Sequence, residues 1–97
     1  MGAPRQYRIQ TYLERDGRHV RLSGARWRHI RKKHPEVSDE EIRLALSQPD
    51  SIQMIDESFV YQRMGEGGML CVAVRVFHGL YIRTAYIRTS NLQERAQ

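Results

Sequence analysis

Two histidines, His29 and His34, flank a run of basic residues in the first third of the chain. On a helix, which turns by about 100° per residue, His34 would share one face with Trp27 and Ile30. His29 would instead lie among the cations of residues 26–33. Because imidazole can change charge near neutral pH, the segment predicts phosphate binding or acid–base chemistry on a phosphate.

Composition supports an acidic partner. The 97 residues fit one domain, and 16 Lys and Arg against 11 Asp and Glu give a net charge of +5. Arginine dominates, and its guanidinium offers a planar fork that matches phosphate. The residues expected to bind RNA are Arg26, Arg28, Arg31, Lys32, Lys33, Tyr61, Arg75 and Arg83.

The sequence argues against several other classes of protein. Cys71 is the single cysteine, so an internal disulfide and a Cys-rich metal site are excluded, and it is expected to be a small buried hydrophobe. No stretch approaches the ~20 apolar residues of a membrane span. A signal pattern is absent at the N-terminus, which predicts a cytoplasmic protein.

The first half of the chain predicts a hairpin and two helices. Residues 7–13 and 19–22 should be strands joined at Asp16 and Gly17. A helix should follow Ser23 and end near His34, before a proline. A second helix should begin at Ser38 with a capping box and bury the apolar stripe of residues 42–46.

The second half predicts strands at residues 51–55, 59–64, 69–77 and 80–88. In the third, the apolar positions from Leu70 to Val76 should face the helices, and Cys71, Ala73 and Arg75 the opposite side. The fold class expected is α+β, with an N-terminal hairpin and two helices on one face of a four-stranded antiparallel sheet. Residues 89–97 should fray. Pattern does not decide which parity of residues 80–88 faces the helices.

Several strand residues could join His34 in a site. Thr84 and Tyr86 would point to the same side of the last strand, and Tyr61 and Arg63 are similarly spaced on another. Hydroxyls and guanidiniums on one sheet surface could hold a phosphodiester. The structural alternative for His34 is a hydrogen bond from its side chain to the last helical carbonyls. A metal site is not expected, since two histidines five apart cannot grip one ion together.

Five motifs follow one another along the chain: His29 with His34-Pro35-Glu36 on the first helix, Pro49-Asp50 at the end of the second, and strands with Tyr61 and Arg63, with Val72 and Val74, and with Thr84-Ala85-Tyr86. In this order they resemble the phage and toxin-associated nuclease domains of the barnase–EndoU–colicin–RelE superfamily. The resemblance covers about residues 24–88 and leaves the hairpin at about 7–22 as an addition. It implies metal-independent cleavage of RNA, by attack of a ribose 2′-hydroxyl on the adjacent phosphate, without a cofactor. The catalytic residues that it implies are His34, His29, Thr84, Tyr86 and Arg63.

Two functions are therefore expected. One is a toxin-like or phage-derived ribonuclease acting on RNA such as tRNA or mRNA. The alternative is a non-catalytic module that binds RNA or protein on the same scaffold, for which the basic helix and the aromatic sheet suffice. An acidic antitoxin or immunity protein is an expected partner in either case, because an inhibitor usually covers the site that it silences.

Overall fold

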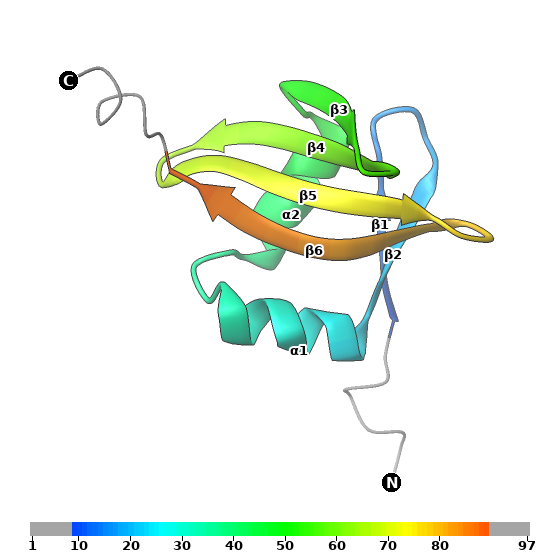
Figure 1. Ribbon diagram of the computed structural model, residues 1–97, viewed down its shortest axis with the longest axis horizontal. Coiled ribbons are helices and arrows are strands. Elements are labelled where there is room, and N and C mark those ends of the chain that lie inside the picture. The colour runs from blue at the N-terminus through cyan, green and yellow to red at the C-terminus, as the bar shows by residue number, and fades with distance from the viewer. Residues whose placement is uncertain (1–8, 90–97) are drawn as a thin grey trace, which may run out of the picture.

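The computed structural model describes residues 9–89, which form a six-stranded mixed sheet and two helices (Figure 1). The α+β class is confirmed. The expected strand start at residues 7 and 8 and the expected frayed tail beyond residue 89 lie outside the described residues. The elements are β1 Ile9–Leu13, β2 His19–Ser23, α1 Gly24–Lys33, α2 Asp39–Ser47, β3 Ser51–Ile55, β4 Ser58–Gly65, β5 Gly68–Val76 and β6 Leu80–Arg88.

The two helices begin where the sequence predicts. Ser23 caps α1, and its hydroxyl accepts a hydrogen bond from the Arg26 amide at 3.1 Å. At α2 both halves of the capping box form, because the Ser38 hydroxyl accepts from the Glu41 amide and the Glu41 carboxylate accepts from the Ser38 amide. These bonds satisfy amide groups that lack a partner inside the first turn. No helix of the described residues is long and apolar enough to cross a bilayer.

The sheet has the order β1-β2-β6-β5-β4-β3. Strands β3 to β6 form the expected antiparallel meander. The expectation of a sheet limited to these four strands is wrong, because the hairpin β1–β2 extends it. Strand β2 pairs in parallel with β6 over only two positions, Val20 with Leu80 and Arg21 with Tyr81.

One sheet face carries the core. Helix α2 contacts β5, β4 and β1, whereas α1 contacts β2 and runs beside β6 (Figure 1). Ile30 of α1 and the stripe Ile42, Ala45 and Leu46 of α2 are buried, as predicted. Leu70, Val72 and Val74 also enter this core, but Val76 is 56% exposed because it lies at the end of β5. We call the opposite side, which holds Cys71, Ala73 and Tyr86, the open face.

A β-bulge determines which side chains of β6 reach the open face. Ala73 pairs with Thr84 and Val74 with Ile82, so Arg83 is the extra residue. A bulge of one residue reverses the alternation of side chains along a strand. Consequently Ile82 lies in the core, whereas Thr84 and Tyr86, which have the same parity in sequence, lie on the open face.

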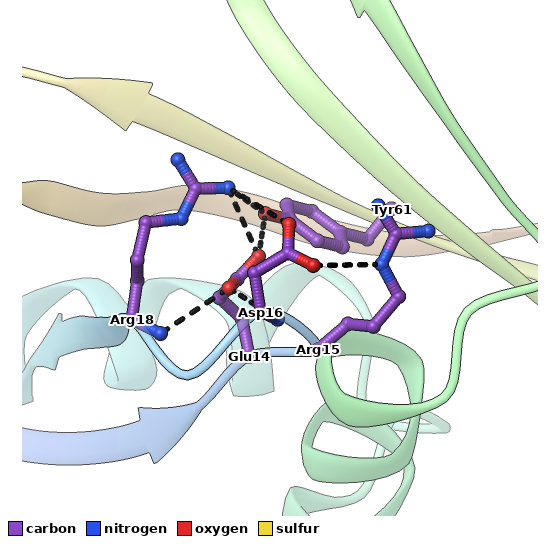
Figure 2. Close-up of polar contacts among 5 residues, drawn as sticks. All are labelled: Glu14, Arg15, Asp16, Arg18 and Tyr61. Atoms are coloured by element: carbon purple, nitrogen blue, oxygen red, sulfur yellow. Dashed lines mark hydrogen bonds and ion pairs between the residues drawn. The ribbon is translucent and has the colours of Figure 1, made fainter.

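A buried carboxylate fastens the hairpin to the rest of the domain (Figure 2). The Glu14 side chain is 0% exposed and accepts hydrogen bonds from the Tyr61 hydroxyl at 2.7 Å and the Arg18 guanidinium at 3.0 Å. Its other oxygen accepts from the amides of Asp16 and Arg18. Burial alone would raise the pKa of Glu14, but these hydrogen bonds outweigh it and lower the pKa to about 2. Glu14 is therefore ionised at neutral pH.

Candidate active site on the open face

The C-terminal end of α1 brings His34 to the edge of β6. His34 ends the helix through its backbone, because its amide donates to the Ile30 carbonyl. Within residues 9–89 the imidazole forms no hydrogen bond to the last helical carbonyls. It instead lies beside the Tyr86 ring, with 6.2 Å between ring centroids, and its side chain is 34% exposed. A half-exposed imidazole beside a phenol is able to reach a substrate bound on this edge.

Tyr86 places its phenol among the small side chains of the open face. It pairs with Cys71 across the sheet and packs over Cys71 and Ala73, which are both buried. Burial raises the pKa of Tyr86, and the adjacent Cys71 raises it further. The hydroxyl is therefore protonated at neutral pH and can donate a hydrogen bond to an anion. Cys71 is a free, buried cysteine, as the sequence predicted.

Thr84 and two arginines extend this surface along β6 and β5. Thr84 is half-buried and lies two residues from Tyr86 on the same face. Arg83, at the bulge, is exposed, and its guanidinium donates to the Ser58 hydroxyl at 3.1 Å. Arg75 is exposed and pairs with Tyr81. Hydrogen-bond donors therefore line the face beside Tyr86.

The structure does not place Tyr61 and Arg63 with this group, so the expectation of one shared surface is wrong for them. Tyr61 is fully buried in the core beneath the helices, where its hydroxyl is bound to Glu14. The Arg63 guanidinium donates to the Gln48 carbonyl at 2.6 Å, beyond the end of α2. Tyr61 pairs with Val72, whose side chain faces the helices, and Arg63 lies two residues further along the same strand. Both side chains therefore point to the helix side of the sheet and away from the face that carries Cys71.

The remaining predicted residues lie on α1. His29 is exposed, and in the described part of the chain no hydrogen bond, ion pair or ring contact joins it to His34 or Tyr86. The guanidinium carbon of Arg31 lies 5.6 Å from the centroid of the Trp27 ring, and the charge of Arg31 remains at the surface. Arg26 lines a groove together with Arg75 and Arg83. The other exposed cations of the helix are Arg28, Lys32 and Lys33.

Glu36 is a further candidate functional residue, and it was not among the site residues expected from the sequence. Its carboxylate lies 3.9 Å from Nδ1 of His34. A carboxylate at this position biases the orientation of the imidazole. The pattern His-Pro-Glu, with the carboxylate two residues after the histidine, was the available signal.

Comparisons with known proteins add no relative. No family model matches the chain, and neither a curated protein nor a solved structure matches it. Among residues 9–89, no three His, Cys, Asp or Glu side chains are grouped so as to hold a metal ion.

Proposed function

We propose that this chain is a metal-independent endoribonuclease, toxin-like or phage-derived, that acts on RNA such as tRNA or mRNA. The observation that supports it most is the approach of the His34 imidazole to the Tyr86 phenol on an arginine-bearing sheet face. An acid–base group, a neutral hydrogen-bond donor and cations are the parts that phosphodiester cleavage needs without a metal. The resemblance of the motifs to nuclease domains points the same way.

In the proposed reaction, His34 accepts the proton of a ribose 2′-hydroxyl. The oxygen attacks the adjacent phosphorus and the bond to the 5′ oxygen breaks, which leaves a 2′,3′-cyclic phosphate. The protonated His34 then returns a proton to the departing 5′ oxygen. Tyr86 and Thr84 donate hydrogen bonds to the phosphate oxygens and so stabilise the charge that develops there, and Arg83 and Arg75 bind the RNA chain further along the same face. Glu36 orients the imidazole.

The proposal is tested by incubating the purified protein with RNA in excess EDTA and analysing the ends of the products. We expect internal cleavage with cyclic phosphate ends, because no step uses a metal. RNA binding with a steep salt dependence but no product between weakly acidic and neutral pH would overturn the nuclease and favour the non-catalytic binding module.

We expect Tyr86→Phe to slow cleavage about ten- to hundredfold, because a hydrogen bond to a charged group contributes about 1.5–3 kcal/mol. The ring that packs on Cys71 remains, so the melting temperature should change little. Thr11→Val is a matched control, since it removes an exposed strand hydroxyl from the edge strand β1, two strands away from β6. Single-turnover rates that fall equally in both variants would contradict the role of Tyr86.

The basic surface also supports a proposed partner. The net charge of +5 and the exposed cations of α1 suit an acidic antitoxin or immunity protein, whose negative charge would speed association. Such an inhibitor would cover the open face and α1 together. A cytoplasmic location, where RNA is available, belongs to the same proposal.

A further inference from the structure

A groove of about 520 Å³ lies between the first turn of α1 and the β5–β6 hairpin. The groove is lined by three arginines, two aromatic residues, a serine and an isoleucine, which come from β2, α1, the end of β5 and β6. The lining residues are Ser23, Arg26, Arg75, Phe77, Tyr81, Ile82 and Arg83. His34, Thr84 and Tyr86 are not among these residues.

The charge of the groove suits an anion. Arg26, Arg75 and Arg83 are all exposed, and none of them forms an ion pair within the described ranges of the chain. No carboxylate lines the groove. Three guanidiniums close together without a counter-charge repel one another, and a phosphate that bridges them would remove that repulsion.

The aromatic content of the groove suits an unpaired base. The Phe77 side chain is 65% exposed, although a benzyl group gains by leaving water. It follows the end of β5, where its backbone bond to Gly79 closes the hairpin. Tyr81 is already covered in part by the Arg21 guanidinium, 5.9 Å from its ring centroid. The Phe77 ring meets the neighbouring His78 ring at a steep angle, with 4.7 Å between ring centroids, and most of its surface stays exposed. Phe77 therefore offers an exposed ring against which a base can stack.

The position of the groove relative to His34 sets its distance from the cleaved bond. Helix α1 and strand β6 lie side by side and run in the same direction (Figure 1). Arg26 and Tyr81, which line the groove, are near the starts of these elements, whereas His34 and Tyr86 are near their ends. Helical rise places Arg26 about 12 Å from His34, and strand rise places Tyr81 about 16 Å from Tyr86. With about 3.4 Å per nucleotide in a stacked strand, this distance corresponds to roughly three to five nucleotides.

We propose that this groove is a second RNA subsite, which holds one unpaired nucleotide with its base on Phe77 and its phosphate between Arg26, Arg75 and Arg83. The inference rests on the proposed ribonuclease function for the location of the cleaved bond. It assigns the substrate class as single-stranded RNA that extends several nucleotides beyond that bond. A duplex does not satisfy the site, because its bases are paired and cannot stack on Phe77.

The subsite is tested by fluorescence anisotropy with a labelled trinucleotide and a labelled nonanucleotide of the same base composition, in protein carrying His34→Ala so that neither is cut. In that background, Phe77→Ala should weaken binding of the nonanucleotide about five- to hundredfold and leave the trinucleotide unchanged. Arg75→Ala should act in the same direction and reduce the salt dependence of binding. A blunt duplex should bind with the same affinity to the His34→Ala protein and to the variant that also carries Phe77→Ala.

Matched controls are Met54→Ala, an exposed apolar side chain on β3, and Arg43→Ala, an exposed arginine on α2, and both should bind the nonanucleotide as the parent does. The subsite would be refuted if the Phe77 variant bound the nonanucleotide as tightly as the parent does. It would also be refuted if the variant lost the same affinity for both oligonucleotides. If His34-containing protein leaves the nonanucleotide uncut but Phe77→Ala still weakens its binding, the nuclease is wrong and the subsite is supported. If Phe77→Ala binds and cuts normally, the subsite is wrong and the nuclease stands.

Discussion

His34→Ala is expected to lower the rate of RNA cleavage about a hundred- to ten-thousandfold in EDTA, because general acid–base catalysis contributes that much. The substitution removes the imidazole beside Tyr86 but keeps the backbone bond by which His34 ends α1. The protein should therefore remain folded, which a near-native circular dichroism spectrum and melting temperature would verify. Single-turnover kinetics at saturating RNA separate the chemical step from binding.

His29→Ala is the matched comparison, because it removes the same group from the exposed side of the same helix. We expect it to raise KM at most and to leave the maximal rate near that of the parent protein. Unchanged cleavage by the His34 variant, with only a lower melting temperature, would reduce His34 to a structural role. A large loss of rate in the His29 variant alone would exchange the two assignments.

The local elements were predictable because their signals lie within a few residues of one another. Ser23 and Ser38 each cap a helix whose first turn they bond, and the apolar spacing of α2 identifies its buried stripe. The alternating valines of β5 likewise mark the core face.

The long-range features were not predictable from pattern. The pairing of β2 with β6 involves only two positions separated by sixty residues, which leave no periodic signal. No glycine in the sequence marks the bulge at Arg83, yet the bulge places Thr84 and Tyr86 on the opposite face of the sheet from Ile82. Tyr61 is expected to bind RNA because its spacing from Arg63 matches that of Thr84 from Tyr86, but it is buried, and the partner that binds its hydroxyl, Glu14, is 47 residues away in sequence.

Glu14→Gln is expected to destabilise the protein by roughly 3 kcal/mol at neutral pH, a large part of the 5–15 kcal/mol that stabilises a typical domain. The amide has nearly the shape of the carboxylate, so the packing of the hairpin is kept. It loses the charge that the Arg18 guanidinium and the Tyr61 hydroxyl stabilise, and its NH₂ group faces donors. Urea unfolding followed by Trp27 fluorescence would measure the difference.

The pH dependence identifies the cause of this loss. Because the pKa of Glu14 falls from 4.5 to about 2 on folding, its ionisation stabilises the native state above the unfolded value, and this stabilisation is lost as pH falls toward 2. The two proteins should therefore converge on acidification, with roughly 2 kcal/mol of their difference gone at about pH 3. Asp16→Asn, which neutralises an exposed carboxylate in the same turn, should cost little at either pH. The difference in free energy of unfolding between the parent protein and Glu14→Gln could instead stay constant with pH. In that case the packing of the hairpin, rather than the charge on Glu14, would hold the hairpin against β4.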